Sequence, residues 1–167
     1  MRWRPERIPA DDRSELGLDK RERILAWTKD PRGRYLVATE AGLILQRAPS
    51  EYGRIGWEQI EQASFRDGHV YLEVDEGAPQ TTSLAIPALD DIQLPIVVRD
   101  RVTASIVVNQ HVPIDGKLGV RVVARRRPGD DRLVWRYWPD PKLEVDSRIE
   151  GLAEAAVSDV RAATGLD

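Results

Sequence analysis

The sequence predicts an α+β protein that is mainly β, built from short antiparallel strands with two helices. Short apolar stretches recur about every 8–12 residues from Arg23 onward, and turn-forming residues separate them. Two later segments have the spacing of helices instead. The chain has 167 residues and no cysteine, so its length suits a domain that buries a core without disulfide bonds.

The composition along the chain indicates three regions. Residues 1–20 are polar, and we expect a loosely ordered N-terminal arm there. Residues 21–110 carry the strand pattern and the first helix. Residues 111–167 carry a β-hairpin and a second helix, which we expect to pack on the same domain. The apolar residues that could anchor the arm are Trp3, Ile8, Leu16 and Leu18.

Most of the expected strands lie before residue 94, at 23–29, 34–39, 43–47, 54–57, 60–66, 69–75 and 80–86. We expect a polar loop at 48–53. Trp57 and Ile60 are three positions apart, so they face one core only through a helix-like turn. The pair Asp67-Gly68 predicts a type I′ hairpin turn, because both central positions of that turn need a positive φ.

The segment 94–109 is predicted to be a helix. Pro95 suits a first helical turn, and Val98, Val102 and Ile106 keep helical spacing. The valines and isoleucines of this segment also favour a strand. We prefer the helix, because the charged run at 99–101 fits a helix with one exposed face better than a buried strand.

Alternating apolar residues then predict a hairpin over residues 118–138 with its turn at 128–131. Trp135 and Tyr137 share the core face of its second strand, whereas Trp138 lies on the opposite face. A helix follows, in which Ser147 and Glu150 have the spacing of a capping box. The apolar stripe of this helix consists of Ile149, Leu152, Ala153, Ala156, Val160 and Ala163.

Seven antiparallel strands followed by a helix is the element order of a pleckstrin-homology-like (PH-like) domain. Residues 54–60, Arg-Ile-Gly-Trp-Glu-Gln-Ile, resemble a motif of bacterial PH-like and GRAM-like proteins: a basic residue, isoleucine, proline or glycine, an aromatic residue and a later isoleucine. Residues 35–43, Tyr-Leu-Val-Ala-Thr-Glu-Ala-Gly-Leu, resemble a hairpin of the same proteins. Over residues 20–110 the chain thus resembles an actinobacterial family of this type.

The resemblance implies an antiparallel barrel or sandwich, capped by a helix, that presents loops and one open end. Such a fold implies a binding module rather than an enzyme. Lipid-binding members often use basic residues on the loop after the first strand. Here Lys29, Arg32 and Arg34 accompany Asp30, which is a thin site for a phosphate group.

The densest charge lies on the predicted C-terminal hairpin. Between residues 119 and 138, six arginines and two aspartates give a local net charge of +4. Residues 139–167 hold seven acidic and three basic residues, a net charge of -4. One interpretation is a strip that binds phosphate or an acidic partner. The other, which we favour, pairs the strip with Glu150, Glu154 and Asp159 of the same molecule, because the two charges adjoin in sequence.

We therefore expect a non-catalytic, cytoplasmic interaction module that binds another protein or a second copy of itself. The alternative is a peripheral binder of anionic lipid or nucleic acid through the arginine-rich hairpin 119–138. Nucleic acid is disfavoured, because the chain's pI of 5.5 lies far below that of typical nucleic-acid-binding domains. The candidate interaction residues are Trp138, Arg125, Arg127, Arg136 and Arg121.

Nothing in the sequence predicts a catalytic, cofactor or metal site. The lack of cysteine excludes thiolate ligands and a cysteine nucleophile, and His69 and His111 each stand alone. The adjacent pairs Asp90-Asp91 and Asp130-Asp131 suit turns and helix starts rather than a shared proton. No apolar run approaches the ~18–20 residues that span a bilayer, and no secretory signal is expected.

Overall fold

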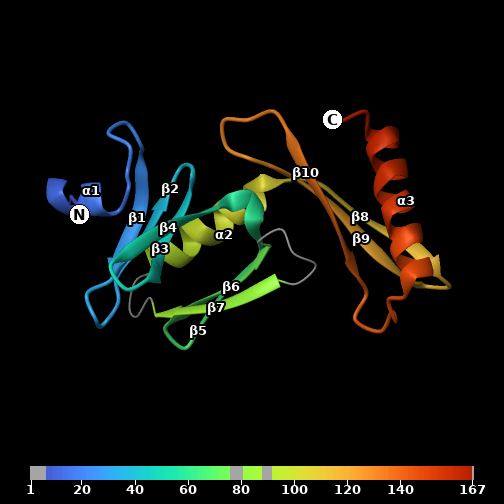
Figure 1. Cartoon of the computed structure of the whole chain (residues 1–167), viewed down its shortest axis with the longest axis horizontal. Helices are drawn as coiled ribbons and strands as arrows, with labels where there is room; N and C mark the ends of the chain where they lie inside the picture. The colour runs from blue at the N-terminus through green and yellow to red at the C-terminus, as the bar shows by residue number, and fades with distance from the viewer. Residues whose placement is uncertain (1–6, 76–80, 88–91, 167) are drawn as a thin grey trace. The chain divides into compact units, whose positions relative to one another are not determined.

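The computed structural model describes residues 7–75, 81–87 and 92–166, and the chain divides into two compact units, residues 1–103 and 104–167. The protein is mainly β, with three antiparallel sheets, which confirms the mainly β and antiparallel part of the predicted fold class (Figure 1). Trp3, Asp90 and Asp91, which were singled out above, lie outside the described residues.

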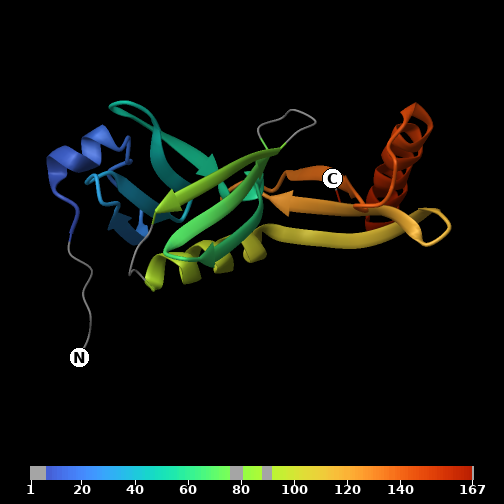
Figure 2. The same cartoon turned by 90° about the horizontal axis from the view of Figure 1, so that it is seen from below.

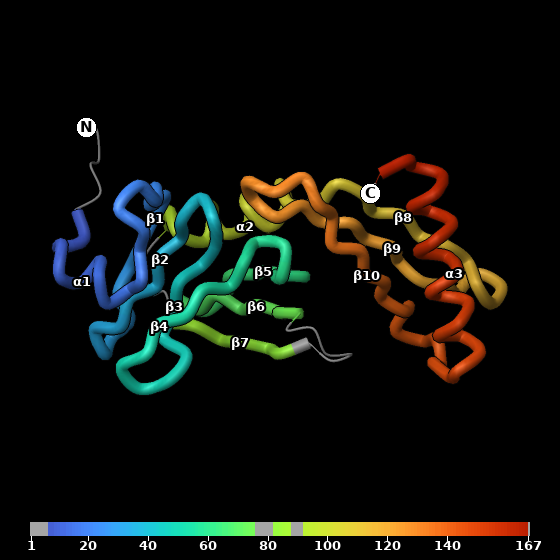
Figure 3. Tube along the Cα trace, turned by 45° about the horizontal axis from the view of Figure 1, so that its top comes forward, coloured from blue at the N-terminus to red at the C-terminus, as the bar shows by residue number. Residues whose placement is uncertain are grey.

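The first unit contains two antiparallel sheets whose strands follow one another in sequence (Figure 3). The first sheet joins β1 (Ile24–Lys29), β2 (Tyr35–Thr39), β3 (Gly42–Ala48) and β4 (Glu51–Gly56). The second joins β5 (Ile60–Arg66), β6 (His69–Asp75) and β7 (Thr81–Pro87). Each predicted strand overlaps an observed one. The strands do not close into a barrel within the described residues, because no ladder joins the two sheets.

Two turns of this unit test the local predictions. The polar loop expected at 48–53 is wrong, because Ala48 pairs with Glu51 and leaves a two-residue turn in which Ser50 has a φ of 59°. The type I′ turn is consistent with the backbone, since Asp67 and Gly68 have φ values of 50° and 69°.

The core of the first unit lies between its two sheets and the helix α2 (Gln93–Ser105). The helix contributes Leu94, Val98 and Val102. A single 3-10 turn, η1 (Trp57–Gln59), connects β4 to β5, and it buries both Trp57 and Ile60 in this core as predicted. The strands contribute Ala26, Leu36, Ala38, Leu43, Leu45, Ile55, Val70, Leu72 and Val74.

Thr39 links the first sheet to the turn that leads into the second. Its hydroxyl accepts hydrogen bonds from the backbone N–H groups of Ala41 and Gly42, both at 3.2 Å, and donates to the Gly42 carbonyl at 3.1 Å. Its own carbonyl accepts the indole N–H of Trp57 at 3.0 Å. Thr39 and Trp57 are 0% and 1% exposed, so each of these bonds satisfies a buried polar group.

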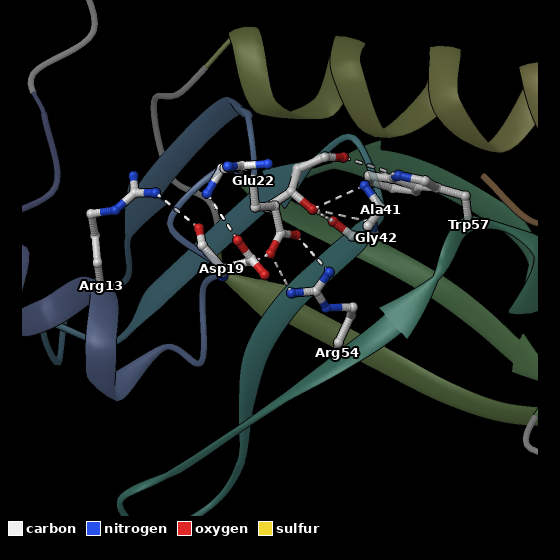
Figure 4. A network of polar contacts seen from close by, with 9 residues as sticks. Arg13, Asp19, Glu22, Ala41, Gly42, Arg54 and Trp57 are labelled. Carbon is white, nitrogen blue, oxygen red and sulfur yellow. Dashed lines mark hydrogen bonds and ion pairs between the residues drawn. The ribbon is translucent and has the colours of Figure 1, made fainter. Parts of the chain in front are cut away.

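An ion pair fastens the segment before β1 to β4 (Figure 4). The Glu22 carboxylate lies 2.5 Å and 2.6 Å from the two terminal nitrogens of Arg54. Burial by itself raises the pKa of Glu22, but the hydrogen bond and the positive charge of Arg54 outweigh it and leave this pKa below its usual value.

The segment 7–20 is more ordered than the predicted arm. It contains the helix α1 (Ala10–Glu15), and Ile8 and Leu16 are buried against the outer face of the first sheet. They pack there with Tyr35, Val37 and Ile44, so β2 is buried on both faces. The polar composition of residues 1–20 does not predict this contact, which the buried Ile8 and Leu16 and the partly buried Leu18 make with the outer face of the first sheet.

The helix predicted over 94–109 is too long. It ends at Ser105, and Ile106 begins the strand β8 (Ile106–Asp115). Beyond this point the chain pairs with the strand β9 (Leu118–Arg126), which satisfies its backbone groups as a helix would. The β-branched residues after Ser105 thus take the strand that their side chains favour.

The second unit is a three-stranded sheet covered on one face by a helix. The sheet has the order β10 (Leu133–Pro139), β9, β8, and the helix is α3 (Ser147–Thr164) (Figure 1). The predicted hairpin and C-terminal helix are therefore confirmed, and β8 is added to them. The core of this unit joins Val120 and Val122 to Ile149, Ala153, Ala156 and Val160 of α3. Of the predicted stripe, Leu152 and Ala163 are exposed.

The start of α3 differs from the predicted capping box by one residue. Asp146, not Ser147, is the N-cap: its side-chain oxygen accepts the backbone N–H of Ile149 at 2.8 Å. The helix ends as expected at Gly165, which has the left-handed conformation with a φ of 63°.

The cap assignment predicts unequal effects of two neighbouring substitutions. Asp146→Ala should lower the free energy of unfolding by about 1 kcal/mol, because it removes the acceptor for a free backbone N–H. Ser147→Ala, the matched control, should change it by less than about 0.5 kcal/mol. Urea denaturation of both variants checks this. A larger loss of unfolding free energy for Ser147→Ala would show that Ser147 is the N-cap, as in the predicted capping box.

Substituting two glycines of the second unit by alanine should change the stability of the protein in opposite directions. A Cβ on Gly119 would collide with the Val112 carbonyl of the neighbouring strand, whereas a Cβ on Gly151 in α3 meets nothing within 4 Å. Gly119→Ala should therefore cost about 1–3 kcal/mol of stability. Gly151→Ala should add about 1 kcal/mol, because alanine is the better helix former. Urea denaturation measures both changes, and a neutral Gly119→Ala would contradict the close approach of β8 and β9.

Candidate functional site

Strand register and side-chain alternation divide the residues of the β8–β9–β10 sheet between two faces. One face packs against α3 and carries Trp135 and Tyr137, as predicted. We call the other the arginine face. It consists of Asn109, His111, Arg121, Val123, Arg125, Val134, Arg136 and Trp138.

Cross-strand pairing aligns the side chains of the arginine face in rows. Arg121 pairs with His111 on one side and with Trp138 on the other. In the next row, Val123 pairs with Asn109 and Arg136. Both arginines are exposed and Trp138 is half-buried. The face therefore combines two exposed guanidinium groups with an aromatic ring and a buried aliphatic residue.

Hydrogen bonds direct the two exposed arginines. Arg121 Nη1 donates to the side-chain oxygen of Asn109 at 2.9 Å, and Arg136 Nη1 donates to the Trp135 carbonyl at 3.1 Å. A guanidinium has five N–H donors in a planar fork. A single bond thus fixes the direction of Arg121 and uses one donor of the five, so the group can still bind an acidic ligand.

Trp138 lies beside Arg121 on the arginine face. Its indole nitrogen is buried and has no hydrogen-bond acceptor among the described residues. The ring is only partly covered, as expected for an aromatic residue placed opposite the core face. Trp138 thus offers a stacking surface next to the Arg121 position.

Two of the five predicted interaction residues are not exposed parts of this face. Arg125 lies in the register of the face but is only 4% exposed, and its Nη1 donates to the Ser105 hydroxyl at 2.8 Å. The prediction that Arg125 is exposed is therefore wrong, because its position at the end of β9 brings it against the end of α2. Arg127 is exposed but follows β9, in the turn toward β10.

The favoured pairing with the acidic C-terminal segment does not describe the arginine face. Burial, together with the carboxylates of Glu150 and Glu154, raises the pKa of Tyr137, which lies on the face that packs against α3. The sheet therefore lies between these carboxylates and the arginine face. Within the hairpin, a local ion pair joins Arg132 to Asp130 at 3.2 Å.

Asp140 closes the edge of the face next to His111. Its carboxylate lies 2.9 Å from His111 Nε2 and accepts the Gly119 backbone N–H at 2.8 Å. The hydrogen bond from His111, with that from Gly119, lowers the pKa of Asp140 below its usual value. One carboxylate thus connects the end of β10 to β8 and β9.

Sequence reasoning missed Asn109, His111 and Asp140 as parts of this site. Asn109 falls within the helix predicted at 94–109, and His111 has no other histidine near it in the sequence. The sequence does contain a strand pattern here: the apolar Val108, Val112 and Ile114 are partly buried in the structure, while the residues between them are exposed. That alternation is typical of a strand.

Comparisons with known proteins add no family to this description. The chain matches no protein-family model, and a search of curated proteins gives no match. Among the described helices, none is long and apolar enough to cross a membrane. Nor does the described part of the chain bring three histidine, aspartate or glutamate side chains together as a metal site needs.

The lowered pKa of Asp140 predicts how its contribution to stability depends on pH. A carboxyl whose pKa is depressed by folding stabilises the protein above its ordinary pKa of 3.8, and this is lost as the pH falls through the lowered value. Asp140→Asn should therefore be less stable than the parent at neutral pH, and the difference should shrink under acid. Urea denaturation across this range tests it, with Asp131→Asn, an exposed turn residue, as the control. A difference that persists unchanged in acid would contradict the assignment.

Proposed function

We propose that this chain is a non-catalytic interaction module that binds an acidic surface of another protein through its arginine face. The observation that carries the proposal is the placement of Arg121, Arg136 and Trp138 on a sheet face turned away from α3. Arginine and tryptophan are enriched at the energetic centres of protein interfaces. A guanidinium also matches the geometry of a carboxylate in a two-point hydrogen bond.

The element order of the first unit supports a PH-like scaffold for the module. A four-stranded meander leads through η1 into a three-stranded meander, and α2 then packs on the core between them. This order accompanies the two motifs: residues 35–43 form β2, the turn after it and the start of β3, and residues 54–60 run from β4 through η1 to the start of β5. A scaffold of this type presents surfaces to partners, and the interaction itself must be argued from those surfaces.

A protein partner is favoured over nucleic acid or lipid by the mixture of side chains on the face. Trp138 and Val134 interrupt the positive charge, and the whole chain has a net charge of -3. A phosphate-binding surface gains affinity from many adjacent cations instead. The apolar positions suit a packed interface with a polar rim.

Self-association is a second candidate, and the chain's own surface favours it. Glu150 and Glu154 are exposed on α3 and give that helix an acidic side. A second copy thus carries a surface of the chemistry that the arginine face would recognise.

Charge reversal on the arginine face tests the proposal. The double variant Arg121→Glu and Arg136→Glu should weaken binding of a fluorescent peptide of glutamate with interspersed leucine by about tenfold or more. The control, Lys142→Glu with Arg148→Glu, makes the same change in net charge at other exposed positions and should bind normally. Fluorescence anisotropy measures binding, and sedimentation velocity of the same proteins detects self-association.

Two outcomes would contradict this function. Equal weakening by both double variants would mean that only net charge matters. Tighter binding of a short DNA duplex or of phosphatidylserine vesicles than of the peptide would favour the phosphate alternative. In that case the two exposed arginines of the face predict a loss of roughly twelvefold in affinity to DNA between about 50 mM and 200 mM salt.

A further inference from the structure

The first unit has an apolar groove between β5 and α2. Its cavity measures about 380 Å³, a volume in the range of ligand pockets. Ala63, Phe65 and Val70 line it from the β5–β6 hairpin, and Pro95, Ile96 and Arg99 line it from the helix. Figure 2 shows α2 running along this sheet. The described lining residues all belong to the first unit, and none of them is part of the arginine face.

Two walls of the groove expose large apolar side chains to water. Phe65 is 46% exposed and Ile96 is 49% exposed. They belong to different elements, β5 and α2, and both line the same cavity. Exposed apolar side chains that meet across a hollow are typical of a binding surface rather than of scattered surface residues.

The strand beside the groove is the edge of its sheet. The order β5–β6–β7 leaves one side of β5 without a neighbouring strand in the described part of the chain. Arg66 and His69 flank the two-residue turn, so they exchange both backbone hydrogen bonds, and the bonding alternates from there. The backbone N–H and C=O groups of Ala63 and Phe65 therefore point toward the open edge. These two residues also line the groove.

The charge of the groove is positive. Arg99 is the charged residue among the described lining residues, and its side chain is exposed. The other lining residues are apolar except Ser64. An occupant that fits this lining presents an apolar side chain to the hollow and a carboxylate to the guanidinium.

We propose that the groove binds an extended segment of a partner protein, which adds to β5 as a further strand. The segment forms backbone hydrogen bonds with Ala63 and Phe65, inserts an apolar side chain between Phe65 and Ile96, and places an adjacent acidic side chain against Arg99. Main-chain bonds supply affinity in this mode, and the pocket supplies specificity. The coincidence of an open strand edge, an apolar hollow and one cation favours this occupant over a small apolar ligand, which needs no strand edge.

The probe for the test is a small set of fluorescein-labelled peptides of threonine and valine that carry one leucine with an aspartate on either side. At least one peptide should bind the full chain in fluorescence anisotropy. Ile96→Glu should weaken its binding at least about tenfold, because the new carboxylate replaces an apolar wall of the groove and repels the aspartates of the peptide. Ile92→Glu is the matched control: Ile92 is 73% exposed and is not among the groove-lining residues, so the binding should not change.

A charge exchange and a backbone readout make the test specific. The Arg99→Glu variant should no longer bind the aspartate peptide, and it should bind the same peptide with lysine in place of aspartate. In hydrogen exchange followed by NMR, the amides of Ala63 and Phe65 should exchange rapidly in the free protein and slowly with the peptide bound.

The proposal is overturned if none of the peptides binds, or if binding survives Ile96→Glu unchanged. It is also overturned if a peptide binds while the two amides continue to exchange rapidly, since the edge strand is then not used. Protection of these amides that rises with protein concentration, without peptide, would assign the edge to a second copy of the chain instead. The charge-reversal variant of the arginine face should bind the peptides normally, which separates this result from the proposed function.

Discussion

The buried hydrogen bond between Trp57 and Thr39 is the constraint on which the first unit depends. Trp57 begins the turn where the chain leaves one sheet for the other, and its indole N–H has a single acceptor, the Thr39 carbonyl. The Thr39 hydroxyl meanwhile closes the β2–β3 turn. A tryptophan in this place fills the core and still pairs its polar atom, as a buried indole requires. The same core supports α2, which forms one wall of the β5–α2 groove.

Much of the fold could be predicted because the strands follow simple local rules. The two-residue turn at Asp67-Gly68 and the three-residue spacing from Trp57 to Ile60 each have one physical explanation. The boundary between α2 and β8 could not be predicted in this way. Val98, Val102 and Ile106 satisfy a helical period, while β-branched residues suit a strand equally well. The backbone partner that decides between them, β9, lies further along the chain.

In the candidate site, too, the features that depend on one strand's own sequence could be predicted, whereas those that depend on distant segments of the chain could not. Alternation along β10 was enough to place Trp138 opposite Trp135 and Tyr137. The burial of Arg125 was not accessible to that reasoning, because its partner, Ser105, comes from the end of a helix twenty residues earlier. His111 and Asn109 join the site only through pairing with β9. A strand's own pattern shows which residues share a face, but neighbouring segments determine which of them reach solvent.

The burial of β2 on both sides has a consequence for how this chain can be handled. Tyr35, Val37 and Ile44 form an apolar surface on the outer side of the first sheet. Ile8 and Leu16, from the segment that precedes β1, cover this surface. Proteolysis or truncation that removes this segment exposes the apolar surface to solvent, and exposed apolar sheet surfaces promote aggregation. Deletions that remove Ile8 or Leu16 therefore expose this surface.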